Sequence, residues 1–332
     1  MKIGIIGTGV FSASIANTLA QNTENKIVMW SENKKLVTDY KKTNKLEPLF
    51  KDKVFPNNIT LTASYDTVLK EVDVVFLMTS IGFVGSVCTA IQEKIDKSIP
   101  VCIGTKGITL YGEKRKFAYK IVKQILKNPV AILSGPTLSE DVVSLDPIAF
   151  NIACRGKKNK TTLLKAFDVP NVKVVFSSDY EGISISGTVK NIYAIGSGLL
   201  AGLGYKESTL AYYLTAVYKE FETILYMYES SLTTLHSLAG FGDLIATCTS
   251  NRSRNYTLGF MLGKKKSKKD IEAFKENNTI EGLNSLEYSL YLFHKKHIKT
   301  PIMTVIAKII NGEEKPDALL EVIKEIKLNS VY

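Results

Sequence analysis

A single lysine is the most chemically suggestive residue in the long apolar stretch 179–202, because its neighbours at helical spacing are small. The stretch lacks proline, so it can form one helix in which residues three and four apart share a face. One such face carries Gly187, Lys190, Asn191, Ala194 and Gly198. A crowded, poorly solvated lysine has a lowered pKa and can act as a base. The same pattern is compatible with a lysine that extends to the surface from a glycine-rich core helix.

Further polar groups follow short apolar runs that are predicted to be strands. Lys106 follows the run 100–104, and the motif Ser134-Gly135-Pro136-Thr137 follows the run 130–133. Ligands of parallel sheets bind at the carboxyl ends of the strands, so both places are candidates for ligand contact. The structural alternatives are a turn lysine beside Gly107, and a Ser134 or Thr137 that caps the next helix.

The C-terminal half holds a second group of polar residues. Asp243 lies in a glycine-rich turn at 239–244, and the segment 247–256 is dense in hydroxyl, amide and guanidinium groups. The rigid fork of an arginine suits a phosphate group, and this segment contains Arg252 and Arg254. Its structural alternative is the N-capped, solvent-facing start of a helix.

The elements that would position these groups begin with a βαβ unit, formed by a strand at 2–6, a helix at 13–20 and a strand at 26–30. Gly7 and Gly9 lie in its first turn, where the first makes the turn and the second lets a pyrophosphate reach the backbone. Ser12 occupies the place of the usual third glycine. The structural alternative is a glycine-rich turn that binds no ligand.

An acidic residue near the end of the second strand bears on the choice of cofactor. A carboxylate at Glu32 would bind the adenosine ribose and disfavour a 2′-phosphate. Lys34 and Lys35 follow at once and could soften that exclusion. The residues therefore favour NAD and leave NADP open.

The remaining runs indicate an α/β fold in two parts. Apolar runs at 73–78, 100–104, 130–133, 148–154 and 172–176 predict a parallel sheet covered on both faces. Beyond residue 180 the pattern is helical, with segments at 180–202, 208–227, 232–238, 270–292 and 301–310. We therefore predict a dinucleotide-binding α/β domain with a parallel sheet at 1–180 and a helical second domain at 181–332.

Composition narrows the class of protein further. The 332 residues carry a net charge of +11, which favours anionic ligands. The run 264–269 lacks interleaved aromatics and indicates a solvated loop or helix end rather than a nucleic-acid surface. The four cysteines form no C-x-x-C pair, and lysines flank His294 and His297, so we predict neither disulfides nor a metal site.

No apolar run reaches the roughly 20 residues that span a bilayer. The early glycines favour a nucleotide-binding turn over a signal peptide.

Six motifs occur in a fixed order along the chain. They are Gly7-Thr8-Gly9, Thr105-Lys106-Gly107, Ser134-Gly135-Pro136-Thr137, Gly187-Thr188-Val189-Lys190-Asn191, Gly240-Phe241-Gly242-Asp243-Leu244 and Cys248-Thr249-Ser250-Asn251-Arg252-Ser253-Arg254-Asn255. Together they resemble the bacterial NAD(P)-dependent glycerol-3-phosphate dehydrogenases, from Gly4 to about Gly312. The last three motifs together are quite specific to that family, whereas G-x-G alone is shared with many others.

The resemblance implies that the N-terminal domain is a Rossmann-type fold and that the C-terminal domain is an all-helical substrate-binding domain. It also implies an oxidoreductase that interconverts sn-glycerol 3-phosphate and dihydroxyacetone phosphate, usually toward glycerol 3-phosphate for phospholipid synthesis. It implies NAD or NADP as cofactor, a small phosphorylated substrate and a cytoplasmic location, and a homodimer is compatible with it. Neither a nucleic-acid partner nor stable membrane insertion is expected.

The resemblance also implies roles for individual residues. Lys190 matches the catalytic lysine, Lys106 a lysine that touches substrate and nicotinamide, and Asp243 a further residue of the catalytic pocket. The other implied substrate contacts are Gly135, Thr137, Ser253, Arg254 and Asn255. The other implied cofactor contacts are Gly7, Gly9, Val10, Phe11, Glu32, Ser139, Arg254, Thr279 and Glu281. Two departures are Ser12 for the third glycine and Glu32 where many members carry a basic residue that suits NADPH.

These roles fit hydride transfer coupled to a proton relay. A neutral Lys190 would take the C2 hydroxyl proton in oxidation, and a protonated Lys190 would return it in reduction. Lys106 would polarise the oxygen, and Asp243 could orient Lys190 or bind a substrate hydroxyl. The alternatives are a related two-domain dehydrogenase acting on a ketoacid, and a non-catalytic dinucleotide-binding or RNA-binding module, which would leave these three residues without a purpose.

Overall fold

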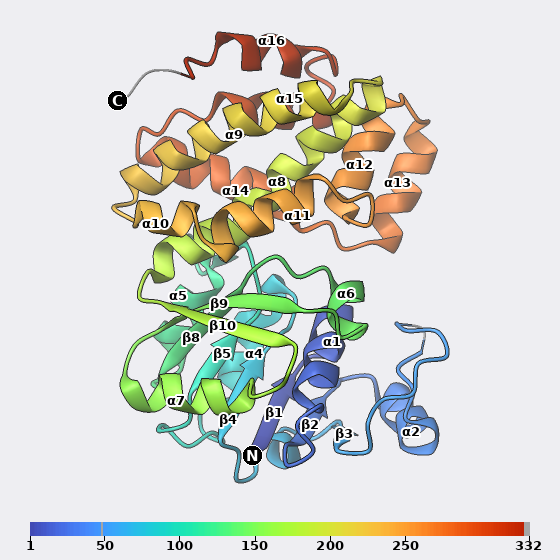
Figure 1. The fold of residues 1–332 in the computed structure, drawn as a ribbon, viewed down its shortest axis with the longest axis vertical. Coiled ribbons are helices and arrows are strands. Elements are labelled where there is room, and N and C mark those ends of the chain that lie inside the picture. The colour runs from blue at the N-terminus through green and yellow to red at the C-terminus, as the bar shows by residue number, and fades with distance from the viewer. Residues whose placement is uncertain (48, 329–332) are drawn as a thin grey trace. The chain divides into compact units, whose positions relative to one another are not determined.

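The computed structural model describes residues 1–47 and 49–328, which divide into two compact units (Figure 1). The sheet unit comprises Met1–Lys106 and Leu110–Tyr180, and the helical unit comprises Gly107–Thr109 and Glu181–Tyr332. The chain therefore enters the helical unit twice, first directly after Lys106 and then after Tyr180.

The sheet unit is built on one eight-stranded sheet in the order β10-β9-β8-β5-β4-β1-β2-β3. The strands are β1 Lys2–Ile6, β2 Lys26–Trp30, β3 Ile59–Thr62, β4 Val74–Leu77, β5 Val101–Ile103, β8 Val130–Ser134, β9 Ile148–Cys154 and β10 Val172–Ser177. Neighbours from β8 to β3 are parallel, whereas β9 is antiparallel to β8 and β10 is parallel to β9. The predicted Rossmann-type fold is confirmed as a mostly parallel sheet.

A small additional sheet lies where the chain first enters the helical unit. Its strands are β6 Ile108–Tyr111 and β7 Lys114–Phe117. Gly112 turns between them with a φ of 59°, a left-handed conformation that glycine adopts without strain. Our reading of the sequence did not include this pair, since its strands are short and β7 is largely charged.

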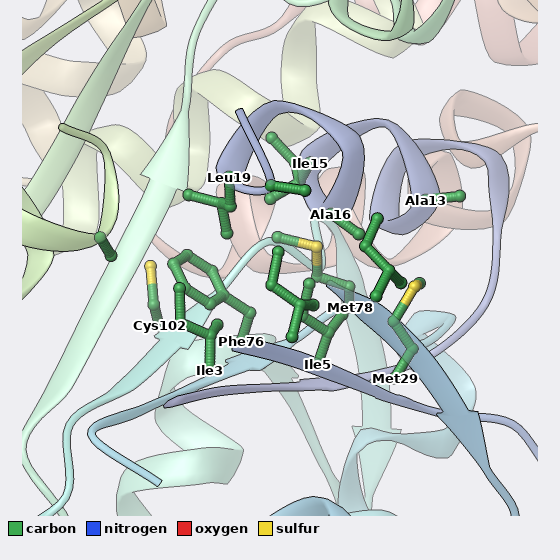
Figure 2. Close-up of a cluster of buried hydrophobic side chains, with 14 of the residues drawn as sticks. Ile3, Ile5, Ala13, Ile15, Ala16, Leu19, Met29, Phe76, Met78 and Cys102 are labelled. Carbon is green, nitrogen blue, oxygen red and sulfur yellow. The ribbon is translucent and has the colours of Figure 1, made fainter. Parts of the chain in front are cut away.

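The helices of the sheet unit cover both faces of the sheet. They are α1 Val10–Leu19, α2 Lys34–Thr43, α3 Tyr65–Leu69, η1 Ile81–Phe83, α4 Val84–Ile91, α5 Ala118–Ile125, α6 Ser139–Val143 and α7 Lys157–Ala166. On one face, Ala16 and Leu19 of α1 belong to a buried cluster with Ile3, Ile5 and Phe76 of the strands (Figure 2). Burying each large side chain of this kind contributes about 1.5–3 kcal/mol, so the cluster holds α1 and its first turn firmly on the sheet.

The helical unit contains the long helix that carries Lys190. Its elements are α8 Tyr180–Leu203, α9 Glu207–Met227, α10 Leu232–Leu235, the π-helical turn η2 Leu238–Gly242, α11 Asp243–Cys248, α12 Arg254–Gly263, α13 Lys268–Asn277, α14 Glu281–Lys295, α15 Pro301–Ile310 and α16 Ala318–Glu325. The prediction of one helical segment at 270–292 is wrong, because the chain leaves the helix between Asn277 and Glu281. Asn278 is extended there, with φ −136° and ψ 135°, and asparagine and β-branched residues are weak helix formers.

Glycines bring α8 and α12 into backbone contact. A Cβ at Gly198 would lie 1.9 Å from the carbonyl oxygen of Tyr256, and one at Gly259 would lie 1.8 Å from that of Ile195. The face of α8 that carries small residues therefore lets α12 approach closely at Gly198. This contact fixes the helix that starts at Arg254 against the helix that carries Lys190.

The remaining sequence predictions concern surface and membrane properties. The run 264–269 is exposed, as predicted for a solvated loop or helix end: residues 264–267 link α12 to α13, and residues 268 and 269 begin α13. His236, His294 and His297 are exposed as well. The four cysteines are buried free thiols. Within residues 1–47 and 49–328, no helix is long and apolar enough to cross a membrane. The same residues contain no cluster of His, Cys, Asp and Glu that could hold a metal ion.

Candidate active site

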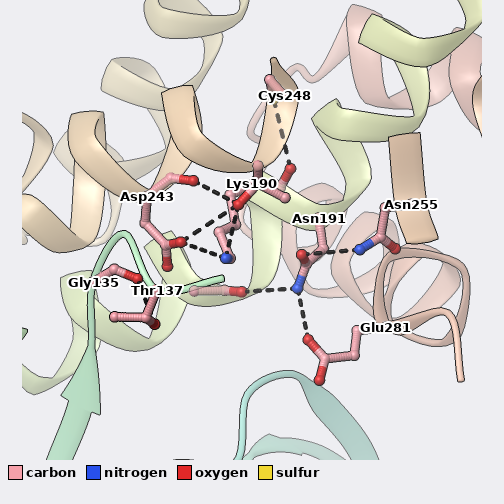
Figure 3. Close-up of polar contacts among 10 residues, drawn as sticks. Gly135, Thr137, Lys190, Asn191, Asp243, Cys248, Asn255 and Glu281 are labelled. Atoms are coloured by element: carbon pink, nitrogen blue, oxygen red, sulfur yellow. Dashed lines mark hydrogen bonds and ion pairs between the residues drawn. The ribbon is translucent and has the colours of Figure 1, made fainter. Parts of the chain in front are cut away.

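Lys190 forms a buried ion pair in the helical unit. It is only 7% exposed, and its Nζ lies 2.5 Å from Oδ1 of Asp243, which is 1% exposed (Figure 3). The same Nζ donates a hydrogen bond to Oγ1 of Thr247 at 2.9 Å. The alternative in which Lys190 extends to the surface is therefore wrong. The ion pair is the contact expected if Asp243 orients Lys190, and binding of a substrate hydroxyl by Asp243 stays a prediction.

Asp243 begins α11 directly after a tightly packed turn. The π-helical turn η2 ends at Gly242, and wide turns of this type occur mostly at functional sites. A Cβ at Gly240 would lie 2.2 Å from the carbonyl oxygen of Thr234, so only glycine fits there. Thr247 lies one turn after Asp243 and donates to its carbonyl oxygen at 2.6 Å. The sequence places Thr247 in a polar segment, but no pattern along the sequence indicates this contact.

A network of amide groups joins α8, α12 and α14 beside the ion pair. Asn191 donates to Oε2 of Glu281 at 2.8 Å, and Asn255 donates to Oδ1 of Asn191 at 3.0 Å (Figure 3). Oδ1 of Asn255 accepts from the backbone N–H of Gly282 at 2.9 Å. Asn255 and Glu281, both predicted ligand contacts, thus also hold three helices together. Asn191 was visible in the sequence one position after Lys190, but its partners lie 64 and 90 residues further along the chain.

The N-terminus of α12 presents positive charge. Ser253 is the N-cap residue and its Oγ accepts from the backbone N–H of Tyr256 at 3.4 Å, which confirms the N-capped helix start. Arg254 follows as the first helical residue and is exposed. Within α12, all of which the structure describes, the first turn carries no acidic residue. Helix amides and a guanidinium at one place favour an anion such as a phosphate.

The predicted cofactor residue Thr279 lies in the link between α13 and α14. It is exposed and lines a pocket of about 360 Å³ together with Asn278 and Asn284. Glu281 begins α14 and is half-buried. The break in the helix that our sequence analysis missed is therefore what exposes Thr279.

In the sheet unit, the two glycines of the first turn differ in the space around their Cα atoms. Gly7 has a φ of 122°, and a Cβ there would lie 2.5 Å from the carbonyl oxygen of Met78, so packing alone requires glycine. At Gly9 the nearest atom to a Cβ would be Oγ of Ser12 at 3.9 Å, so packing does not require glycine at this position. The open backbone at Gly9 lies at the N-terminus of α1, which suits a dinucleotide pyrophosphate. Val10 and Phe11 form the first turn of α1 and are half-buried.

Ser12 replaces the third glycine without opening a gap. It is 1% exposed, and its Oγ donates to the carbonyl oxygen of Gly9 at 2.8 Å. The hydroxyl therefore fastens the first turn of α1 from within.

The carboxyl end of β2 carries Glu32 beside aromatic side chains. Glu32 is exposed, and Trp30 stacks on Tyr65 with ring centroids 4.4 Å apart. Burial, and secondly the Glu32 carboxylate, raise the pKa of Tyr65, which places that carboxylate near the phenol. Lys34 and Lys35 are exposed at the start of α2.

The other predicted residues of the sheet unit lie at strand ends. Lys106 is half-buried after β5, and Gly135 follows β8 with a φ of 152° and room for no side chain, since a Cβ would lie 2.9 Å from the carbonyl oxygen of Ala149. Thr137 donates to the carbonyl oxygen of Gly135 at 3.1 Å (Figure 3). Leu138 is the N-cap residue of α6, so the alternative in which Ser134 or Thr137 caps that helix is wrong.

Ser139 is fixed to α1 by hydrogen bonds. Its carbonyl oxygen accepts from Oγ of Ser14 at 2.8 Å, and Asn17 donates to the carbonyl oxygen of Val143 at 3.1 Å. These bonds hold α6 beside α1, so Ser139 and the first turn at Gly9 keep a constant separation.

Comparison with known proteins assigns both parts of the chain. Residues 2–160 match the model described as the NAD-dependent glycerol-3-phosphate dehydrogenase N-terminus, and residues 179–321 match the model described as its C-terminus. A glycerol-3-phosphate dehydrogenase (NAD(P)+) from Thermoanaerobacter sp. is 31% identical over 319 residues, which cover 95% of this chain and 94% of that protein. A protein of the same name from Clostridium botulinum is 28% identical over 321 residues, or 96% of each chain.

Solved structures agree with these sequence matches. The crystal structure of glycerol-3-phosphate dehydrogenase from Coxiella burnetii superposes with a TM-score of 0.90 at 26% identity, and covers 98% of this chain and 99% of that one.

Proposed function

Because the chain belongs to the NAD-dependent glycerol-3-phosphate dehydrogenase family, we propose that it interconverts sn-glycerol 3-phosphate and dihydroxyacetone phosphate. The observation that carries this proposal is the buried pair of Lys190 and Asp243, 2.5 Å apart, beside a cationic helix start. A buried lysine needs such a partner to remain charged, and a proton relay needs such a lysine.

In this proposal Lys190 moves the proton of the reaction. When bound, a nicotinamide cofactor would supply or accept the hydride. In reduction the Lys190 ammonium donates a proton to the C2 oxygen of the substrate, and in oxidation the neutral amine takes it back. Asp243 stabilises the ammonium and Thr247 holds Nζ in place. Positioned acid–base groups of this kind contribute about 10²- to 10⁴-fold to a rate.

The phosphate group of the substrate is proposed to bind at the start of α12. Arg254 and the backbone N–H groups of the first turn would hold its oxygens, while Ser253 and Asn255 fix the turn from below. In the sheet unit, Lys106, Gly135 and Thr137 are proposed as further substrate contacts.

The cofactor residues remain proposals of the same kind. The backbone at Gly7 and Gly9, with Val10 and Phe11, would receive the pyrophosphate of NAD or NADP, and Glu32 the adenosine ribose. Lys106, Ser139, Arg254, Thr279 and Glu281 are the other proposed contacts. Cytoplasmic glycerol 3-phosphate made in this way would supply phospholipid synthesis, and a homodimer is the proposed assembly.

The test is an assay of reduced-nicotinamide absorbance with the purified full-length chain. We expect dihydroxyacetone phosphate to cause rapid loss of absorbance, and dihydroxyacetone, which lacks the phosphate, to cause almost none. NADH and NADPH are run in parallel. Binding of either cofactor without turnover of dihydroxyacetone phosphate would contradict the proposal, and turnover of a phosphate-free ketoacid would favour a different dehydrogenase.

A further inference from the structure

Glu220 is a buried acid of the helical unit that contacts none of the proposed substrate residues. It lies on α9, is 5% exposed, and its Oε2 accepts from the backbone N–H of Ile302 at 2.7 Å. Its Oε1 accepts from the N–H of Met303 at 3.1 Å and from the hydroxyl of Tyr193 at 3.0 Å. The carboxyl group therefore caps α15 from the side of α9. A helix N-terminus offsets part of the cost of burying the negative charge.

The third of these bonds reaches the helix that carries Lys190. Tyr193 lies three residues after Lys190 on α8, and its carbonyl oxygen accepts from the hydroxyl of Tyr213 at 2.7 Å. Tyr213 can approach because Gly196 lacks a side chain, since a Cβ there would lie 2.2 Å from the Tyr213 hydroxyl. The hydroxyl and the carbonyl oxygen of Tyr193 are thus both hydrogen-bonded, one helical turn after Lys190.

A buried thiol connects this group to the ion pair. The thiol of Cys248 lies 4.0 Å from the carbonyl oxygen of Lys190. Burial raises the pKa of Cys248, Lys190 lowers it and Asp243 raises it further, so the thiol senses both charges. Burial raises the pKa of Tyr193, with smaller contributions from Glu220, Tyr213 and Cys248. Buried hydrogen bonds therefore run from the start of α15 through Glu220 to the Tyr193 hydroxyl, and one turn of α8 joins Tyr193 to Lys190.

We propose that Glu220 is a positioning residue that fixes Lys190 through the Tyr193 hydroxyl. The inference rests on the proposed role of Lys190 in proton transfer. An ionised carboxyl group accepts all three hydrogen bonds, whereas a protonated one carries a donor and has less acceptor capacity, which weakens them. The titratable groups that face these hydrogen-bonded residues are Tyr193 on α8, Tyr213 on α9 and Cys248 on α11. Burial raises the pKa of Glu220 to about 7, so the change of state falls in the neutral range.

Two conservative variants of the full-length chain test the proposal. Tyr193→Phe removes only the hydroxyl, and we expect kcat for dihydroxyacetone phosphate to fall about fivefold with little change in KM, as the loss of one hydrogen bond would produce. Glu220→Gln removes the titration, and we expect a lower kcat whose dependence on pH between 6 and 8 is flatter than in the wild type. In both variants, amide hydrogen exchange in α8 around Lys190 should quicken about tenfold.

Tyr212→Phe is the matched control. Tyr212 lies on α9 beside Tyr213, and its hydroxyl donates to the carbonyl oxygen of Ile323 at 3.0 Å, away from α8. This variant should lose similar stability but keep the wild-type kcat and the wild-type exchange around Lys190. The proposal is overturned if all three variants behave alike. If the wild type does not reduce dihydroxyacetone phosphate while Tyr193→Phe still quickens exchange around Lys190, the positioning stands and the proposed function fails.

Discussion

The two units hold their candidate residues in opposite ways. The sheet unit offers backbone at Gly9 and half-buried side chains at strand ends, and its described residues include no buried charged side chain. Among the residues that the structure describes in the helical unit, three charged side chains are buried: Lys190, Glu220 and Asp243. Net charge differs as well: the sheet unit has 25 lysines and arginines against 16 acids, giving +9, and the helical unit has 18 against 16, giving +2.

This difference suggests that the sheet unit mainly binds the cofactor, whereas the helical unit carries out proton transfer. A positively charged surface with open backbone attracts an anionic cofactor and can be built from loops between strands. Proton transfer needs charges removed from water, where each interaction is stronger and each unpaired charge more costly. Substitutions at the open backbone and exposed side chains of the sheet unit should therefore change affinity, and substitutions of the buried charged residues of the helical unit should change turnover and stability.

The largest expected effect is that of removing the buried lysine. Lys190→Met should lower kcat about 10³-fold because the proton relay is lost, while the Kd of NADH stays within about twofold of the wild type. Loss of the ammonium partner of the buried Asp243 carboxylate should also lower the free energy of unfolding by about 3–5 kcal/mol. Steady-state kinetics, cofactor titration and urea unfolding measure these three quantities.

Lys206→Met is the control, because Lys206 is an exposed lysine of the same unit. It should behave as the wild type. Retention of more than a tenth of the turnover by Lys190→Met would show that chemistry does not depend on the buried pair, and the contrast between the units would then fail.

The second effect is a dependence of stability on pH that originates in the helical unit. Burial raises the pKa of Glu220 from 4.5 to about 7, so the folded chain binds this proton more tightly than the unfolded chain. Its contribution to stability is complete below about pH 4.5 and is lost as pH rises through about 7, a total of about 3 kcal/mol. Unfolding of the wild type and Glu220→Gln at pH 5 and pH 8 measures it. Equal slopes for the two proteins would disprove the assignment.

The same contrast decides what sequence reasoning could predict. Gly7, Gly9, Lys106 and Gly135 follow strands, and strand ends can be located from apolar runs alone. The polar network could not be located in this way, since Asn191 meets Asn255 and Glu281 only through the packing of α8 against α12 and α14. The break before Glu281 was also missed, because asparagine and threonine lower helix propensity by too little to mark an end.

A matched pair of glycine substitutions tests the sheet unit. Gly9→Ala should fold with nearly wild-type stability, because a Cβ has 3.9 Å of room, yet raise the Kd of NADH about tenfold or more by blocking the pyrophosphate. Gly7→Ala should instead destabilise the fold, because its φ is 122° and a Cβ would lie 2.5 Å from a carbonyl oxygen. Thermal unfolding and cofactor titration distinguish the two. Normal cofactor affinity in Gly9→Ala would place the pyrophosphate elsewhere.

The smallest effect concerns the choice between cofactors at Glu32. Glu32→Gln removes a carboxylate that would repel a 2′-phosphate, so the ratio of kcat/KM for NADPH to that for NADH should rise about tenfold. Glu24→Gln, which alters another exposed acid of the sheet unit, should leave the ratio unchanged. A wild type that already prefers NADPH would show that Lys34 and Lys35 outweigh Glu32. Because Glu32 is exposed and far in sequence from Lys190, kcat with saturating NADH should not change, and a fall in kcat would mean that the sheet unit does more than bind.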